Sequence, residues 1–410
     1  MATVVLAGTL DTKGGEYRWM RDRLRASGCE VLLVDTGVLP PPDSAPDPDF
    51  TARTVARAAG HDLEALRSAG DRGAAVTAMA EGLERLVREL YESGGMHAML
   101  AAAGSGGSAI AARAMRSLPV GVPKLLVSTM AGGDVSPYVG SGDLTLMYSV
   151  VDVAGINSVS ERVLGNAVAA VAAMARHHEE SLAAPRGSGR KVVAATMFGV
   201  TTPAVEAARA RLEELGYEVL VFHATGAGGK AVEKLAAEGA LDGVLDLTTT
   251  ELADELVGGV LSAGPARLTA ASAAGVPQVV APGALDMVNF GPRETVPDRF
   301  ADRNLLVHNP TVTLMRTTAG EMAELGTSIG NKLAGASAPA EVVWPLRGVS
   351  AVDAPGGPFE DGPADAAGLA TLREALDGTA VPVHEVDAHL NDAEFAVGAA
   401  DRLHRLISER

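Results

Sequence analysis

The sequence predicts an α/β protein with two related Rossmann-like lobes, each a mostly parallel sheet flanked by helices. Short apolar runs that are partly β-branched, such as residues 4–7 and 30–35, alternate with stretches whose apolar residues recur at helical spacing. The chain also repeats itself without a gap, because Val4 aligns with Val192 and Gly28 with Gly216. The repeat predicts two lobes of the same architecture.

The length of 410 residues is typical of two domains rather than one. Residues 185–190 are rich in Pro, Gly and Ser and form the best linker in the sequence. We therefore expect lobes at residues 1–184 and 191–410, with a cleft between them.

Composition excludes several classes of protein. There are 34 Lys and Arg residues against 51 Asp and Glu, a net charge of −17, so a broad nucleic-acid interface is not expected. The single cysteine, Cys29, excludes an intrachain disulfide and indicates a reducing compartment; we expect it to be a buried thiol. With no signal segment and no apolar run of membrane-spanning length, we expect a cytoplasmic protein without membrane contact.

The turn after the first predicted strand is the first candidate site. Gly8, Thr9, Asp11, Thr12 and Lys13 lie between the carboxyl end of a strand and the amino end of a helix. Free backbone N–H groups and the helix dipole favour an anion at such a position, and Lys13 would add a positive charge. The turn is neither a Walker A loop nor Gly-x-Gly-x-x-Gly, so a tight turn with a solvated lysine is an equal alternative.

A second glycine loop strengthens the case for a phosphate site. Gly104, Ser105, Gly106, Gly107 and Ser108 follow another predicted strand and precede a helix. Strand-end loops of one parallel sheet converge at the same edge, and small residues let backbone donors approach phosphate oxygens. The alternative is that these residues only reflect a composition rich in glycine and alanine.

The second lobe lacks a counterpart of Lys13 but carries polar groups at its predicted strand ends. We single out Glu251, Asp286, His308 and Arg316 as candidate catalytic residues that could face one cleft. Each has an ordinary structural alternative, such as capping a turn. No paired histidines stand at zinc-ligand spacing, so we expect no protein-bound metal site. Residues 344–362, dense in Gly and Pro, are interpreted as either a lid or a surface loop.

Several long motifs in a fixed order resemble one family. They are Gly8–Lys13 with Glu16, Gly104–Ser108, Ser128–Tyr138, Asp286–Gly291 and His308–Thr318. Together they closely resemble the Tm-one-like ATP-binding family over almost the whole chain. The family has no agreed reaction, and its plant member is a tobamovirus resistance protein whose amino-terminal region binds a viral replication protein.

The resemblance implies a two-lobed homodimer with ATP, with or without Mg²⁺, on the first lobe. Asp11, Glu16 and Asp134 are the candidate partners for a nucleotide-borne Mg²⁺. The implied nucleotide ligands come from the three strand-end loops: Gly8, Thr9, Asp11, Thr12, Lys13, Gly104, Ser105, Gly106, Gly107, Ser108, Thr129 and Met130.

Two functions from different classes follow. The first is an ATP-dependent ligase, kinase or hydrolase, with a small anionic substrate held between the lobes by Arg316 and His308. The second is an ATP-regulated protein that binds a protein partner without consuming ATP. A lobe pair that binds a sugar or amino acid has the right shape but lacks the export signal usual for such proteins.

Overall fold

The fold was analysed in a computed structural model, which describes residues 1–183 and 189–409. The chain forms two compact units, Met1–Arg186 and Gly187–Arg410, and each is described by itself. Both units are α/β, which confirms the predicted two-lobed α/β class. Residues 185–188 of the predicted linker lie outside the described residues.

The first unit alternates strands and helices along the chain. Its elements are β1 (Thr3–Gly8), α1 (Leu10–Ala26), β2 (Glu30–Asp35), α2 (Ala52–Ala58), α3 (Leu63–Ala69), α4 (Arg72–Glu92), β3 (Ala98–Ala103), α5 (Ser105–Ser117), β4 (Lys124–Ser128), η1 (Thr129–Gly132), α6 (Ser136–Val139), β5 (Thr145–Tyr148) and α7 (Ser160–Ala183).

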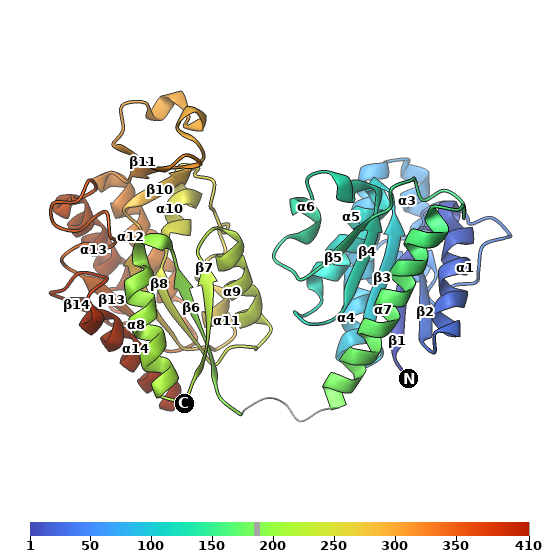
Figure 1. The fold of residues 1–410 in the computed structure, drawn as a ribbon, viewed down its shortest axis with the longest axis horizontal. Coiled ribbons are helices and arrows are strands. Elements are labelled where there is room, and N and C mark those ends of the chain that lie inside the picture. Colours follow the sequence, from blue (N-terminus) through green and yellow to red (C-terminus); the bar gives the residue numbers. More distant parts are fainter. Residues whose placement is uncertain (184–188, 410) are drawn as a thin grey trace. The chain divides into compact units, whose positions relative to one another are not determined.

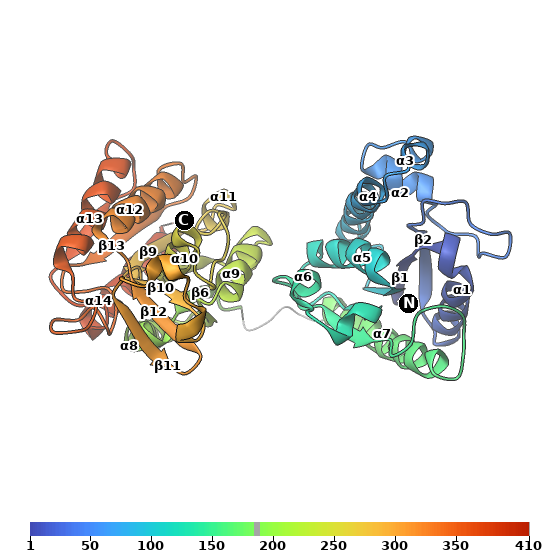
Figure 2. The same ribbon diagram turned by 90° about the horizontal axis from the view of Figure 1, so that it is seen from above.

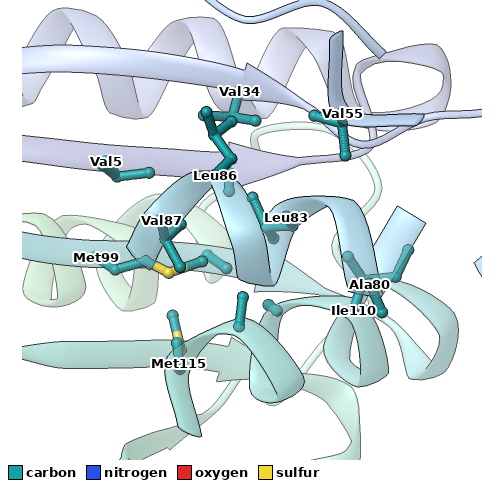
Figure 3. Packing of buried hydrophobic residues seen from close by; sticks show 14 of the residues in the cluster. Val5, Val34, Val55, Ala80, Leu83, Leu86, Val87, Met99, Ile110 and Met115 are labelled. Atoms are coloured by element: carbon teal, nitrogen blue, oxygen red, sulfur yellow. The ribbon is translucent and has the colours of Figure 1, made fainter. Parts of the chain in front are cut away.

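The five strands of this unit form one parallel sheet in the order β2-β1-β3-β4-β5. Helices α1 and α7 cover one face, where Tyr17, Met20 and Leu24, which recur at helical spacing, are fully buried. Helices α2, α4 and α5 cover the other face (Figures 1 and 2). Figure 3 shows Leu83 and Val87 of α4 packed among strand residues Val34 and Met99. The carboxyl ends of β1 and β3 therefore open onto the amino ends of α1 and α5.

The second unit has a longer list of elements: β6 (Val192–Met197), η2 (Gly199–Thr201), α8 (Thr202–Glu214), β7 (Glu218–His223), α9 (Ala227–Ala237), β8 (Gly243–Thr248), α10 (Thr250–Val257), α11 (Ala270–Ala273), β9 (Gln278–Gly283), β10 (Met287–Phe290), η3 (Arg293–Thr295), η4 (Asp298–Phe300), β11 (Leu305–Asn309), β12 (Val312–Arg316), α12 (Ala319–Ala334), β13 (Ala340–Pro345), α13 (Gly362–Leu376), β14 (Val383–Val386) and α14 (Ala393–Ser408).

Its main sheet is parallel, in the order β14-β13-β9-β8-β6-β7. The strand order around β6 and β8 repeats that around β1 and β3, as the internal repeat predicts. Helices α8 and α14 pack together on one face of this sheet, and α12 and α13 belong to a second apolar cluster (Figure 1).

Two segments of the second unit differ from the sequence-based interpretation. Residues 281–290 and 308–316 carry the polar groups that we expected at strand ends, but much of these ranges lies within β10, β11 and β12, which form an antiparallel sheet. Residues 344–362 are not a plain surface loop, because Trp344, Val349 and Phe359 are at most 1% exposed, and the alternative of a lid stays a prediction. Both segments therefore contribute buried side chains to the core of the second unit.

Cys29 is buried, as expected. No helix in the described ranges 1–183 and 189–409 combines the length and the apolar character needed to cross a membrane.

Candidate functional site

A pocket of about 610 Å³ opens at the carboxyl edge of the first unit's sheet. It lies between the turn after β1, the segment joining α3 to α4, and the amino end of α5. The polar part of its wall contains eight of the twelve nucleotide ligands implied by the family resemblance: Thr9, Asp11, Thr12, Lys13, Gly104, Ser105, Gly106 and Gly107. The structure therefore brings the two glycine-containing loops to one site.

The amino end of α5 is the open anion position of this pocket. Ser105, Gly106 and Gly107 are its first three residues, and their backbone N–H groups have no hydrogen-bond partner within the described chain. Gly104 precedes the helix in extended backbone, and no side chain caps it. Three unpaired N–H groups at the positive end of a 13-residue helix suit a phosphate group.

Cationic side chains reinforce this position. Arg72, the first residue of α4, lines the pocket, and no ion pair or hydrogen bond engages its guanidinium among the described residues. A Cβ built on Gly106 would lie 3.7 Å from Arg72 Nη2, so the guanidinium lies beside the glycine loop. Lys13 Nζ donates to the carbonyl oxygen of Val153 at 2.5 Å, which leaves two of its three N–H groups for a ligand.

The amino end of α1, by contrast, is already occupied by carboxylates. Asp35 Oδ1 accepts the Leu10 N–H at 3.1 Å, and Asp11 Oδ2 accepts the Leu39 N–H at 3.0 Å. Burial raises the pKa of Asp35 to about 6, although the N–H groups of Gly37 and Leu10 oppose this shift. A phosphate placed directly on this helix end would face two acidic groups, so α5 is the better phosphate position.

The four remaining predicted ligands do not line this pocket. Gly8 lies beneath it, where a Cβ would meet the Tyr17 ring at 1.9 Å. The hydroxyl of Ser108 is buried against Ser128 Oγ at 2.7 Å. Thr129 lines a neighbouring pocket, and Met130 is 38% exposed. None of these positions tests ligand binding, so all four stay predictions.

The candidate magnesium partners are also separated. Asp11 lines the pocket, and its Oδ1 is buried without a hydrogen-bond partner among the described residues. Glu16 is 5% exposed and accepts the Gly155 N–H, whereas exposed Asp134 accepts the Ser136 N–H at 3.0 Å. Asp11 therefore has the best placement of the three.

Sequence reasoning missed several residues of the pocket wall. Asp152 follows the end of β5, so reading one more strand end would have found it. Arg72 begins a helix distant in sequence, and no local pattern marks it. The apolar wall likewise comes from four separate segments and consists of Val38, Leu39, Leu66, Ala75, Val76 and Ile110.

In the second unit, Glu251 belongs to a buried ion cluster. Its Oε2 accepts from Arg267 Nε at 2.7 Å, and its Oε1 accepts the Gly226 N–H at 2.7 Å. Arg267 also pairs with Asp246, and Arg267 and Glu251 are at most 1% exposed. These contacts indicate that Glu251 stabilises the fold. Its predicted catalytic role stays a prediction.

Arg316 and Asp286 lie in a second buried cluster. Arg316 Nη2 pairs with Asp365 at 2.7 Å and lies 3.5 Å from Asp353, while Nε donates to the Phe359 carbonyl oxygen at 2.8 Å. Asp286 Oδ2 accepts from the Ser350 hydroxyl at 2.8 Å, and burial raises the pKa of Asp286 to about 7. The guanidinium is thus engaged by protein groups.

His308 lies apart from these clusters, exposed on β11. No hydrogen bond or ion pair engages its ring within residues 1–183 and 189–409. The structure therefore brings Arg316 and Asp286 together but gathers neither Glu251 nor His308 with them in one open pocket.

The family comparisons agree over both units. The model of the N-terminal domain of an uncharacterised protein family, UPF0261, matches residues 2–180, and the model of its C-terminal domain matches residues 190–407. A UPF0261 protein of Clostridium tetani is 48% identical over 99% of both chains. The resemblance is thus confirmed at the level of the family, while nothing in these matches addresses ATP.

A plant protein is also similar. The ToMV resistance protein Tm-1(GCR237) of Solanum lycopersicum is 41% identical over 97% of this chain, which spans 55% of the tomato protein. A solved structure of Methanocaldococcus jannaschii UDP-GlcNAc 2-epimerase covers 98% of this chain and 92% of its own, with 8% identity and a TM-score of 0.21. That score is too low for any argument about function.

Proposed function

Given that the chain belongs to the UPF0261 family, which is described only as uncharacterised, we propose that its first unit binds ATP in the 610 Å³ pocket. The observation that carries the proposal is the row of unpaired N–H groups at Ser105–Gly107, with the guanidinium of Arg72 beside it. These groups would hold the phosphates, and Lys13 would add a second cation from the opposite loop.

The rest of the wall fits the remainder of a nucleotide. Val38, Leu66, Val76 and Ile110 supply an apolar surface within the same pocket, which suits the flat face of a base. The volume lies within the range usual for small-molecule sites, roughly 300–1,000 Å³. A polar end and an apolar end in one pocket favour a nucleoside phosphate over free phosphate.

Magnesium fits as a companion of the phosphates. No group of three or more His, Cys, Asp or Glu side chains in the described part of the chain is arranged to hold a metal. Asp11 lines the pocket, and its Oδ1 lacks a partner among the described residues. This carboxylate would hold Mg²⁺ together with phosphate oxygens, and the ion would neutralise charge between them.

The proposal assigns no chemical step to the second unit. Glu251, Asp286 and Arg316 are committed to buried internal contacts, which supports a structural role for them. We place the activity in the cytoplasm, because a single cysteine among 410 residues suits a reducing compartment. Release of ADP, measured alongside binding, separates an ATP-dependent enzyme from an ATP-regulated binding protein.

Isothermal titration of ATP in Mg²⁺ tests the site. We expect Arg72→Ala to weaken ATP binding about tenfold, the loss of one charge-assisted contact. Lys13→Ala should weaken it less, because Lys13 already donates to Val153. The matched control is Arg57→Ala on α2, an exposed arginine outside the pocket. Wild type without ATP binding, or equal affinities of Arg72→Ala and Arg57→Ala, would contradict the proposal.

A further inference from the structure

A second pocket of about 430 Å³ adjoins the proposed nucleotide site. The two pockets share Gly104, Ser105 and Asp152 as wall residues. The other residues that line the second pocket come from the ends of β4 and β5, and they are Thr129, Tyr148, Ser149, Val150 and Val151. A molecule here would lie next to the loop to which we assign the phosphates.

Ser149 gives this pocket an unsatisfied polar group. The residue is 4% exposed, and its hydroxyl has no hydrogen-bond partner in the described part of the chain. A buried hydroxyl without a partner costs roughly 1–3 kcal/mol, so such groups usually meet a ligand or an ordered water. Because Ser149 lines the pocket, a polar ligand can supply the missing bond.

The backbone that carries Ser149 is strained. Val150 has a φ of 65°, and the Val151 N–H donates to the Ser149 carbonyl oxygen at 2.7 Å, the pattern of a three-residue γ-turn. Positive φ is rare for a β-branched residue and costs about 1–3 kcal/mol. Strain of this kind clusters at ligand sites, and here it sets the wall between Tyr148 and Asp152.

The chemistry of the wall selects a class of ligand. Ser105, Thr129 and Ser149 provide hydroxyls, Asp152 provides a carboxylate, and Tyr148 provides a half-exposed ring packed on Gly132. No lysine, arginine or histidine occurs among the described residues that line it. A carboxylate with hydroxyls and an aromatic face suits a neutral molecule bearing several hydroxyls. The wall offers an anion no cationic side chain, and the Ser105 N–H is the group that we assign to the nucleotide phosphates.

We propose that this pocket binds a neutral polyhydroxylated molecule of monosaccharide size, with Asp152 and Ser149 bonded to its hydroxyls. The idea that this molecule is a second substrate beside ATP rests on the proposed nucleotide site. Binding of the molecule in this pocket does not. The small anionic substrate predicted at Arg316 and His308 is a separate hypothesis, because neither residue belongs to this wall, and it stays a prediction.

Saturation-transfer NMR with D-glucose, D-ribose and myo-inositol on the full chain tests the proposal. At least one should receive saturation from wild type, with and without saturating ATP. Asp152→Asn should lower the signal about fivefold, equivalent to one lost hydrogen bond. Asp22→Asn, an exposed carboxylate on α1, should not change it.

Three results would overturn the inference: no transfer to any of the three compounds, equal transfer to Asp152→Asn and Asp22→Asn, or complete loss of transfer when ATP is added. The last result would make the pocket part of the nucleotide site. If wild type fails to bind ATP, the proposed function falls, and the spectra without ATP still decide whether the polyol pocket exists.

Discussion

The two units share the same strand order but differ at the carboxyl edge of their sheets. In the first unit, β3 runs into α5, whose first turn carries glycines and unpaired N–H groups that face a pocket. In the second unit, β8 occupies the same place in the strand order and runs into α10, whose first turn is entirely buried. One edge is open, and the other is filled by protein.

The second residue of each helix shows the difference most directly. Gly106 holds this position in α5, and a Cβ there would have only ordinary contacts. Glu251 holds it in α10, and its carboxylate accepts backbone N–H groups and pairs with Arg267. The second unit thus holds a carboxylate of its own, which accepts N–H groups at the amino end of the neighbouring α9, whereas the first unit leaves the amino end of α5 open. The strand order is the same around the two helices, while local side chains decide whether the edge is open or filled.

Removing the cation of the second unit should have the largest effect. Arg267→Ala would leave the carboxylates of Asp246, Glu251 and Glu233 without their shared partner. Loss of one partner of a buried ion pair costs roughly 3–5 kcal/mol, so we expect that much loss in the free energy of unfolding by urea. Arg209→Ala removes an exposed pair with Glu213 and should cost under about 1 kcal/mol. Equal stability of both variants would mean that this cluster does not hold the edge closed.

A carboxylate introduced at the open edge should strongly weaken ATP binding without unfolding the protein. Gly106→Glu would place a carboxylate beside Arg72, as Glu251 lies beside Arg267. We expect ATP affinity to fall about a hundredfold, because the new anion competes for the same cation and helix end. Gly106→Gln has the same shape without the charge and should lose much less affinity. Wild-type affinity in Gly106→Glu would remove α5 from the nucleotide site.

The sequence was informative where one chain segment carries the whole signal. The parallel strands, the face of α1 and the repeat follow from local periodicity, and the glycine loops follow from strand-end position. The antiparallel sheet of β10, β11 and β12 was missed because it contains polar residues such as Asn289, opposite Leu314, and Thr313, opposite Phe290. These polar residues are buried only because of partners distant in the sequence. Arg72 and the commitment of Arg316 to Asp365 likewise depend on tertiary contacts that no local pattern records.

The buried acids of the second unit should make its stability depend on pH. Asp353 faces Asp286, Asp365 and Arg316, and burial raises the pKa of both Asp353 and Asp286, the latter to about 7. In the unfolded chain these groups ionise near pH 4, so between about pH 4 and 7 the folded state binds more protons. Stability therefore falls as pH rises through this window and levels off above the folded pKa values.

The melting temperature measures this effect in a background that isolates the second unit. The chain has two tryptophans, and Trp19→Phe leaves Trp344, buried in the second unit, as the reporter. We expect a fall of roughly 5 °C from pH 5 to pH 8, and a flatter profile in Asp353→Asn, which cannot ionise. The exposed Asp302→Asn should behave like the parent. Identical profiles for the two variants would contradict an ionising Asp353.

The smallest effect is expected at Ser108, a predicted nucleotide ligand that the fold turns away from the pocket. Its hydroxyl is buried and bonds to Ser128 Oγ at 2.7 Å, and its N–H donates to the Gly104 carbonyl oxygen at 2.9 Å. Ser108→Ala should cost about 1 kcal/mol of stability through the lost hydrogen bond and leave ATP affinity within about twofold of wild type. A tenfold loss of ATP affinity would mean that the Ser108 hydroxyl contributes to the nucleotide site. The contrast between an open first unit and a filled second unit would then depend on hydroxyls as well as on the glycines.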